Sequence, residues 1–314
     1  MNLTTAMDVS IVIPAYNEQE NVKELYSKVS KTMKTLGKKY ELIFIDDGSS
    51  DNTFEELLKL SKTDKNLRVI KFRRNFGQTA AWDAGFKQAK GKVVVTMDAD
   101  LQNDPEDIPR LIKKLDEGYD AVSGWRYKRK DNFSKRIFSS FSRLLRRLII
   151  KDDIHDSGCS LKAYKKDCLE GLDMQGEMHR YIAQLLILKG YKVGEMKVNH
   201  LARKKGKTKY GLLRLPKGFL DLIVVAFWQR YASRPIHLFG GAGILSSLLG
   251  IITGSYLVFR KFYYSEPIAD RPLLMLSVLL VIIGIQFIIF GLIADILTKT
   301  YYSGKKHYSI EKKI

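Results

Sequence analysis

The chain is poor in cysteine and lacks the signatures of several protein classes. Its 314 residues include two cysteines, too few for a disulfide framework, which favours a reducing compartment. No charged N-terminal stretch precedes an apolar run, so we expect no cleaved signal peptide. The absence of a G-x-G-x-x-G fingerprint argues against a dinucleotide-dependent oxidoreductase. His155, His179 and His200 do not have the spacing of a zinc site.

Acidic residues are scarce relative to basic ones. The chain has 53 Lys and Arg against 34 Asp and Glu, a formal charge of +19. Such a balance indicates a polyanionic partner, which can be nucleic acid, anionic lipid or a phosphorylated substrate. No RNP-like or zinc-finger motif is present, and the basic residues cluster beside apolar segments, so we expect no nucleic-acid partner.

Two C-terminal stretches contain no charged residue at all. Pro235–Phe259 and Pro272–Ala294 are each long enough for the roughly 20 residues that a spanning helix needs. A pair of buried core helices is the alternative. We predict a transmembrane hairpin over 235–296 in an integral membrane protein with two spans. The tail 297–314 is richer in lysine than the loop between the spans, so the positive-inside rule places both flanks of the hairpin, and with them residues 1–211, on the cytoplasmic face.

Two further segments are amphipathic or apolar without being long enough to span. Residues 133–151 alternate Phe and Leu with Arg and Lys at helical spacing, and residues 212–234 carry several aromatic side chains. An ordinary surface helix is the alternative for the first. Beside a membrane anchor, we predict that both are interfacial helices in contact with membrane lipid.

Residues 1–211 alternate between β-rich runs and helical patterns. Strands are expected at 10–13, 41–45, 68–72, 93–97 and 120–123, with helices between them. This alternation predicts an α/β domain with a doubly wound, mainly parallel sheet. In such sheets ligands bind outside the carboxyl ends of the strands. Acidic residues follow two of these strands, at Asp46-Asp47 and at Asp98-Ala99-Asp100.

The stretch after the fourth predicted strand is the strongest candidate site. Asp98 and Asp100 follow a buried strand at i, i+2 spacing, and two close carboxylates are most stable with a cation between them. A pair of solvated turn residues is the alternative. Asp104 and Pro105 then provide an N-cap and first turn for a helix. The pattern predicts a Mg²⁺ or Mn²⁺ site held by Asp98 and Asp100.

The motifs together resemble a known family. The resemblance is to family 2 GT-A glycosyltransferases, and more narrowly to their polyprenyl-phosphate branch, which includes dolichyl-phosphate mannose synthases and bactoprenyl-phosphate glucosyltransferases. It covers about Val9–Tyr231, and a C-terminal pair of spans is common in that branch. The motifs that carry it are IVIPAYNE (Ile11–Glu18), FIDDGSSD (Phe44–Asp51), RNFGQTAA (Arg74–Ala81), MDADLQNDPEDIP (Met97–Pro109), GYDAVSGWR (Gly118–Arg126), HDSGCSLKAY (His155–Tyr164), GEMHRYI (Gly176–Ile182) and RKKGKTKYG (Arg203–Gly211).

The resemblance implies transfer of a single sugar, with inversion, from a UDP- or GDP-linked donor to a membrane polyprenyl phosphate. Mg²⁺ or Mn²⁺ on Asp98 and Asp100 would hold the diphosphate, with Ala99 between them, and Gln102 would face the sugar. The residues implied for the base and ribose are Pro14, Tyr16, Glu18, Asp46 and Asp47, and those implied for phosphates are Arg126, Arg203 and Lys209.

The resemblance also implies an acceptor side. Asp156 is the candidate catalytic base or acceptor-orienting residue beside Asp100, and a structural helix-capping role is its alternative. His179 and Arg180 are candidate contacts of the acceptor phosphate. Two departures from the family pattern are Thr208, where Ser is usual, and Cys159–Lys162, where many relatives have Phe-Arg.

Other functions remain open at this point. A glycosyltransferase acting on a hydroxyl lipid or polysaccharide shares several of these motifs, although the Q-x-x-R-W signature of processive synthases is absent. From a different class, the chain can be a non-catalytic membrane-tethered scaffold or a polyanion-binding protein. A homo-oligomer is also possible.

Overall fold

The computed structural model describes residues 7–127, 154–172, 174, 176, 178–201, 227, 231, 234–268 and 271–302. The chain forms two compact units, Met1–Asp221 and Leu222–Ile314. The predicted interfacial helix at 133–151, most of 212–234 and the tail after 302 lie outside the described residues. The predicted domain boundaries therefore stay predictions.

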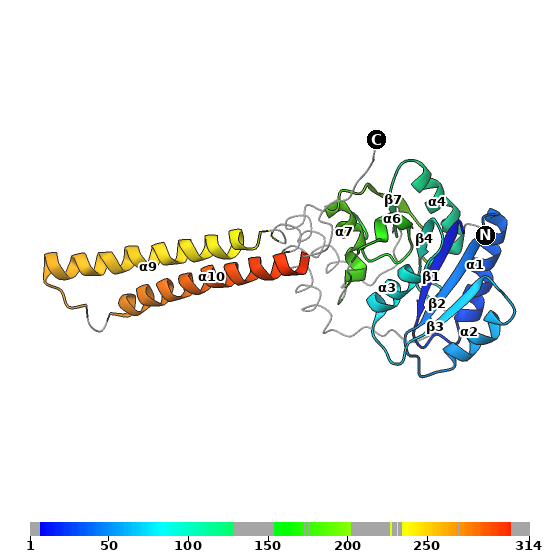
Figure 1. Ribbon diagram of the computed structural model, residues 1–314, viewed down its shortest axis with the longest axis horizontal. Helices are drawn as coiled ribbons and strands as arrows, with labels where there is room; N and C mark the ends of the chain where they lie inside the picture. The colour runs from blue at the N-terminus through cyan, green and yellow to red at the C-terminus, as the bar shows by residue number, and fades with distance from the viewer. Residues whose placement is uncertain are drawn as a thin grey trace. The chain divides into compact units, whose positions relative to one another are not determined.

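The first unit alternates strands and helices along most of its length (Figure 1). Its elements are β1 (Val9–Ala15), α1 (Val22–Leu36), β2 (Tyr40–Asp46), α2 (Thr53–Ser61), β3 (Leu67–Lys71), α3 (Gln78–Gln88), β4 (Val93–Thr96), η1 (Pro105–Asp107), α4 (Ile108–Asp116), β5 (Ala121–Trp125), β6 (Lys162–Lys165), α6 (Lys166–Leu169), η2 (Met178–Tyr181), α7 (Ile182–Leu188) and β7 (Val193–Lys197).

The strands form one seven-stranded sheet in the order β3-β2-β1-β4-β6-β5-β7. Every adjacent pair is parallel except the two that involve β6, which is antiparallel to both β4 and β5. The predicted mainly parallel, doubly wound sheet is confirmed. Strands β6 and β7 were not predicted, because KAYK and VGEMK are short and show no long β-branched run.

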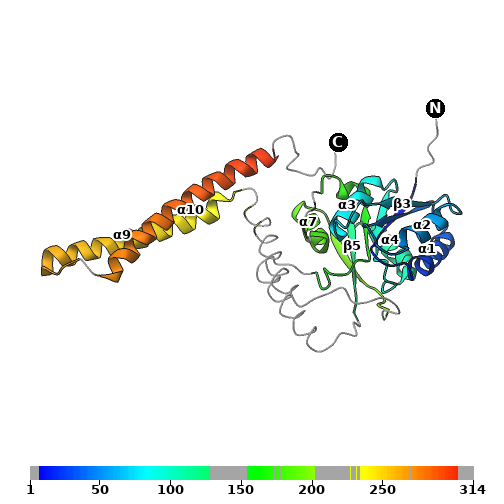
Figure 2. The ribbon, with the colours of Figure 1, turned by 90° about the horizontal axis from the view of Figure 1, so that it is seen from below.

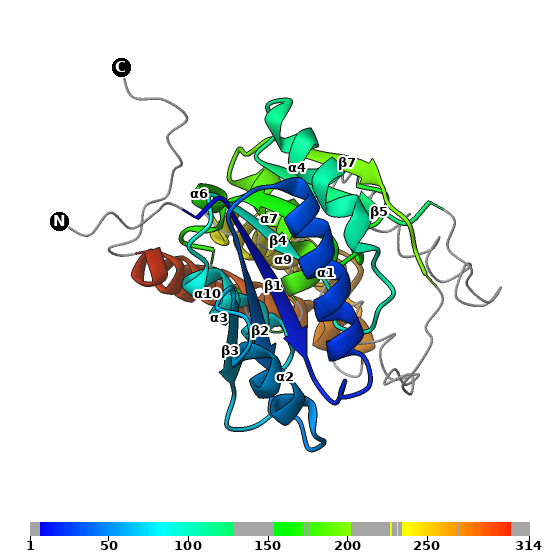
Figure 3. The ribbon, with the colours of Figure 1, turned by 90° about the vertical axis from the view of Figure 1, so that its right-hand side faces the viewer.

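Helices cover both faces of the sheet, with α1, α2 and α4 on one side and α3 and α7 on the other (Figures 2 and 3). Successive side chains of β2 point to opposite faces. Leu42 and Phe44 join the core under α1 and α4, whereas Ile43 and Ile45 join the core under α3. The central strands are therefore buried on both faces, as expected for a parallel sheet.

The start of α1 differs from the sequence-based expectation. Asn17 followed by Glu20 matches the pattern of an N-cap with a capping-box residue, which predicts that Asn17 caps this helix. This prediction is wrong, because α1 begins at Val22 and Asn21 occupies the N-cap position. Asn17 instead has a left-handed φ of 52°, and its side-chain oxygen accepts a hydrogen bond from Ser50 N at 2.8 Å. Its side chain thus holds the loop after β2. The predicted cap at Asp104 is confirmed, because its carboxylate accepts from Glu106 N.

The second unit contains a hairpin of two long helices, α9 (Ile236–Tyr264) and α10 (Pro272–Tyr302). Both are long and apolar enough to cross a membrane, and most of their hydrophobic side chains are exposed. The predicted helical hairpin is confirmed, although α10 continues to Tyr302, six residues past the expected end of the hairpin at residue 296.

Small residues line the contact between α9 and α10. A Cβ added to Gly243 would lie 2.5 Å from the carbonyl oxygen of Gly284, and the Ser246 hydroxyl donates to Leu280 O at 2.8 Å. Glycine allows such close backbone approach, which is how helices pack in lipid without a hydrophobic driving force between them.

Candidate active site

A cleft of about 210 Å³ opens at the carboxyl ends of the central strands. Seven residues predicted to bind the donor or the metal line it, namely Pro14, Tyr16, Glu18, Asp47, Asp98, Ala99 and Asp100. The cleft is also lined by Ala15, Asn75, Gly77 and Gln78, which were not predicted individually. Asn75, Gly77 and Gln78 belong to the RNFGQTAA motif (Arg74–Ala81). That motif contributed to the family resemblance, but no role was assigned to its individual residues.

The parallel register brings these residues together. Strand β1 pairs with β2 so that Ala15 lies opposite Asp46, and with β4 so that Val12 lies opposite Thr96. The segments that follow all three strands therefore emerge at one edge. Proline has no backbone N–H to donate within a sheet and is therefore rare in central strands. Pro14 is tolerated in β1 because β4 pairs with β1 only as far as Val12.

Asp47 connects the end of β2 to the start of α3. Its two carboxylate oxygens accept the backbone N–H groups of Phe76, at 2.7 Å, and Gly77, at 2.9 Å. Burial raises the pKa of Asp47, and these two hydrogen bonds oppose that effect. Gly48 permits the approach, since its φ is +69° and an added Cβ would lie 2.3 Å from the Arg74 backbone. Asp47 thereby fixes the position of Gln78, the first residue of α3.

Asp98 and Asp100 carry the strongest electrostatic feature of the cleft. Burial, and then repulsion from Asp100, raises the pKa of Asp98 to about 6, although hydrogen bonds from Ser160 and Gln78 and the charge of Arg126 oppose this. Gln78 Nε2 donates to Asp98 Oδ1 at 2.6 Å. Asp100 accepts the backbone N–H of Gln102 at 3.1 Å. A cation beside the two carboxylates would relieve both the burial cost and the repulsion.

The donor set suits a hard divalent ion. Among the described residues, no group of three or more His, Cys, Asp or Glu side chains could hold a metal. Asp98 and Asp100 would supply two carboxylates and leave further positions to water and a diphosphate, as Mg²⁺ sites in nucleotide-binding proteins often do. The residues thus fit the predicted ion.

Three of the described residues predicted to bind the donor do not line the cleft, namely Asp46, Gln102 and Arg126. The Asp46 carboxylate is fully buried at the end of β2, where one oxygen accepts Ser49 N at 3.2 Å and the other has no hydrogen-bond partner. Gln102 is partly buried, and its backbone carbonyl accepts Leu201 N at 2.9 Å. The roles predicted for Asp46 toward the nucleoside, for Gln102 toward the sugar and for Arg126 toward phosphates stay predictions.

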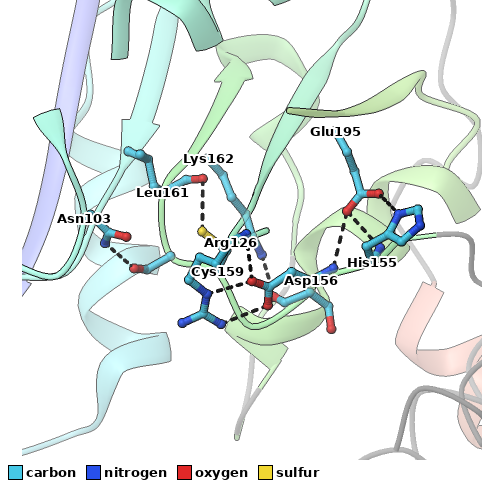
Figure 4. Close-up of polar contacts among 10 residues, drawn as sticks. Asn103, Arg126, His155, Asp156, Cys159, Leu161, Lys162 and Glu195 are labelled. Atoms are coloured by element: carbon cyan, nitrogen blue, oxygen red, sulfur yellow. Dashed lines mark hydrogen bonds and ion pairs between the residues drawn. The ribbon is translucent and has the colours of Figure 1, made fainter. Parts of the chain in front are cut away.

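Arg126 and Asp156 form a bidentate ion pair at the end of β5 (Figure 4). Arg126 Nε donates to Asp156 Oδ2 at 2.7 Å and Nη2 donates to Oδ1 at 2.9 Å. Burial lowers the pKa of Arg126, but the hydrogen bonds and charge of Asp156 outweigh that effect and leave it raised. The segment with Asp156 is itself held by Glu195, which accepts from His155 N at 2.9 Å.

Lys162 is a buried cation that sequence reasoning did not assign to the site. It is 1% exposed on β6, and its Nζ donates to the carbonyl of Ser157 at 3.1 Å. Burial lowers its pKa to about 8, while the charges of Asp156 and Asp98 act in the opposite direction. No signal in the sequence marks this lysine, because a Lys in a four-residue strand is normally at the surface.

The predicted acceptor and phosphate contacts are only partly described. His179 is 7% exposed, and its Nδ1 lies 2.7 Å from the Thr79 hydroxyl. Arg180 lies beside it in η2. Arg203 and Lys209 lie outside the described residues, so their predicted roles toward phosphates stay predictions.

Comparisons with known proteins agree with this geometry. Residues 10–172 match the model of the family described as Glycosyl transferase family 2. The chain is 39% identical over 302 residues to a dodecaprenyl-phosphate galacturonate synthase from Rhizobium johnstonii, covering 95% of this chain and 89% of the relative. The chain belongs to glycosyl transferase family 2. It is a glycosyltransferase, and the resemblance to the polyprenyl-phosphate branch is confirmed.

Solved structures with a similar fold support only the architecture of this chain, because their sequence identity to it is low. The glucosyl-3-phosphoglycerate synthase from Mycobacterium tuberculosis, in complex with Mn²⁺, UDP and phosphoglyceric acid, has a TM-score of 0.57 at 18% identity and covers 71% of this chain and 78% of its own. A mannosyltransferase from Pyrobaculum calidifontis, in complex with GDP-Man and Mn²⁺, has a TM-score of 0.52 at 17% identity. The match covers 98% of this chain and 77% of the mannosyltransferase.

Proposed function

We propose that this glycosyltransferase moves one sugar from a nucleoside-diphosphate donor to a membrane polyprenyl phosphate and inverts the anomeric carbon. The observation that carries the proposal is the 39% identity to a dodecaprenyl-phosphate galacturonate synthase over 95% of the chain. The apolar helical hairpin supports it further, because an enzyme with a lipid-anchored acceptor must work at a membrane surface.

The sugar proposed first is galacturonate, on the basis of that relative's name. The base of the donor is uracil or guanine. Two neighbours of the same fold were solved with UDP-glucose and GDP-mannose respectively, so the fold accommodates both bases. Pro14, Tyr16, Glu18 and Asp47 line the part of the cleft proposed for the nucleoside.

Asp98 and Asp100 would hold Mg²⁺ or Mn²⁺ against the donor diphosphate. When bound, such an ion neutralises the negative charge that develops on the departing nucleoside diphosphate. Mn²⁺ occurs with the nucleotide in several neighbours of this fold, which supports the assignment. The positive charge of Arg126 also acts on Asp98 and lowers the pKa of its carboxyl.

The reaction proposed for this site needs little base catalysis. An ionised oxygen of the polyprenyl phosphate attacks the anomeric carbon, and the bond from that carbon to the β-phosphate oxygen breaks as the nucleoside diphosphate leaves. The second pKa of a phosphate monoester is near 6, so the nucleophile is mostly ionised at neutral pH. We infer that Asp156, which is paired with Arg126, orients the acceptor side rather than removing a proton.

The membrane placement is part of the proposal. Hairpin helices α9 and α10 would span the bilayer, with the catalytic unit on the cytoplasmic face, because the lysine-rich tail flanks the same side as that unit.

The test is a transfer assay with purified full-length protein, undecaprenyl phosphate in detergent and Mn²⁺. The donors are radiolabelled UDP-galacturonate, UDP-glucose, UDP-N-acetylglucosamine and GDP-mannose. We expect label in the organic phase with one donor, released by mild acid as a glycosyl phosphate is. Label that requires a hydroxyl lipid and survives mild acid would identify a hydroxyl-acceptor enzyme instead. No transfer from any donor, with folded protein, would contradict the proposal.

A further inference from the structure

The carboxylate of Asp98, the proposed metal ligand, interacts with two neutral hydrogen-bond donors from separate parts of the fold. Gln78 Nε2, at the first position of α3, donates to Asp98 Oδ1 at 2.6 Å. The second donor is the side chain of Ser160, which precedes β6 and whose hydrogen bonding lowers the pKa of the Asp98 carboxyl. Both donors favour the ionised form of Asp98, and neither brings a charge that would compete with a cation.

Ser160 is fixed in turn by two further hydrogen bonds. Asn103 Nδ2 donates to Ser160 Oγ at 2.7 Å, and Thr96 Oγ1 donates to the Ser160 carbonyl at 2.7 Å (Figure 4 shows Asn103). Asn103 and Ser160 are each 4% exposed and Thr96 is fully buried. Water therefore does not compete for these contacts.

The direction of these hydrogen bonds follows from the number of protons and lone pairs that each group has. A serine hydroxyl has one proton and two acceptor lone pairs. Because the Asn103 N–H occupies a lone pair of Ser160 Oγ, the hydroxyl proton remains available to Asp98, which as a carboxylate can only accept. The order is thus Asn103 to Ser160 to Asp98, with Gln78 donating from the other side.

Asn103 also links this chain to the segment after β7. It forms an isolated antiparallel bridge with His200, and the neighbouring Leu201 N donates to Gln102 O at 2.9 Å. Asn199 N donates to Asp107 Oδ2 at 2.7 Å. The loop that follows the two carboxylates is therefore held against both β6 and the extension of β7, which restricts how Asp98 and Asp100 can reorient.

We propose that Gln78, Ser160 and Asn103 are positioning residues that hold Asp98 in the orientation a divalent cation requires. The inference depends on the metal role assigned to Asp98 in the proposed function. Partners of metal ligands commonly change metal affinity by 10–100-fold when removed, because the ligand then has to be ordered by the metal itself.

The test measures Mn²⁺ binding directly, by the electron paramagnetic resonance signal of free Mn²⁺ in the presence of UDP, on full-length protein. We expect Ser160→Ala and Gln78→Met to raise the Mn²⁺ dissociation constant about tenfold. Ser160→Thr, which keeps the hydroxyl, should restore affinity to within about threefold of the wild type, a recovery that a packing role alone would not produce.

Ser123→Ala is the matched control. Ser123 is 1% exposed on the adjacent strand β5, and its hydroxyl has no hydrogen-bond partner, so the same substitution removes a buried hydroxyl without touching Asp98. It should leave Mn²⁺ affinity unchanged. Gln78 lies at the cleft wall and tests the idea independently if a change at Ser160 prevents folding.

The outcomes separate this inference from the proposed function. Ser160→Ala and Gln78→Met proteins that bind Mn²⁺ as tightly as the Ser123→Ala protein would overturn the positioning role and leave the metal site intact. Wild-type protein that binds no Mn²⁺ with UDP would instead overturn the metal assignment itself.

Discussion

Arg126 places its Nε and Nη2 against the two oxygens of a single carboxylate, that of Asp156, in a pair whose side chains are 14% and 13% exposed. Such bidentate geometry requires a guanidinium, and lysine cannot reproduce it. The pair joins the end of β5 to the segment before β6, beside the cleft with Asp98. We therefore expect the two residues to act as one unit.

Arg126→Lys and Asp156→Asn should each lower kcat/KM by about 100-fold, and the double variant should lose less than about tenfold more than the worse single variant. The reason is that either change leaves the other partner of a buried pair in the wrong position. Steady-state kinetics with saturating donor measures this. Losses that multiply in the double variant would show that Asp156 works independently of Arg126, as a general base would.

Asp98 should make the metal-free protein less stable as the pH rises. Its pKa is raised to about 6 from 3.8, so the folded protein binds this proton more tightly than the unfolded chain does. The associated stability is fully present below about pH 4 and is lost between about pH 4 and pH 6, by at most about 3 kcal/mol.

Asp98→Asn should consequently melt at a higher temperature than the wild type at pH 7.5 in EDTA, and at nearly the same temperature at pH 4. Differential scanning calorimetry at several pH values checks this. Wild-type and Asp98→Asn proteins with parallel curves at all pH values would rule out a destabilising charge at Asp98. With Mn²⁺ and UDP, only the wild type should gain stability.

The glycine contact between α9 and α10 should be essential to the hairpin. Gly243→Leu places a side chain where a Cβ already lies 2.5 Å from Gly284 O, so the helices must separate. We expect a loss of about 1–2 kcal/mol in hairpin stability, the magnitude of a good interhelical contact in lipid.

Gly241→Leu is the control, since nothing lies within 4 Å of a Cβ at Gly241, two residues away on the same helix. Crosslinking of a cysteine pair placed at Ser246 and Leu280, whose side chain and backbone are in contact, measures helix proximity in the membrane. Equal crosslinking in the Gly241→Leu and Gly243→Leu backgrounds would contradict the packing described.

The link between the two hairpin helices should lie across the membrane from the catalytic unit. A cysteine at the exposed Ser265 should react with a membrane-impermeant maleimide in intact cells, whereas one at the exposed Lys113 should react only after permeabilisation. Cys159 and Cys168 are buried and should not interfere. Labelling of Lys113→Cys in intact cells would place the catalytic unit on the outside.

The sequence was sufficient for the parts of the fold that have regular patterns. Alternating β-rich and helical segments predicted the parallel sheet, and the rule that ligands bind at the carboxyl ends of its strands led to Asp98 and Asp100. The uncharged runs at 235–259 and 272–294 predicted the hairpin.

The remaining features depend on tertiary contacts that no local pattern encodes. Strand β6 pairs antiparallel between β4 and β5, and this insertion buries Lys162 within the sheet. Asn17 looked like a helix cap, but the loop after β2 recruits its side chain instead. Gln78 lies within a recognised motif, yet its contact with Asp98 follows only from the way Asp47 holds the start of α3.

The most direct test of the whole account is whether a divalent ion joins Asp98 and Asp100 to the diphosphate of the donor. Electron spin echo measurements on protein with Mn²⁺ and UDP detect phosphorus nuclei near the bound ion. The account predicts phosphorus coupling in the wild type and its loss, together with bound Mn²⁺, in Asp98→Asn and Asp100→Asn. Wild-type coupling that persists unchanged in both variants would place the ion elsewhere and contradict the central claim.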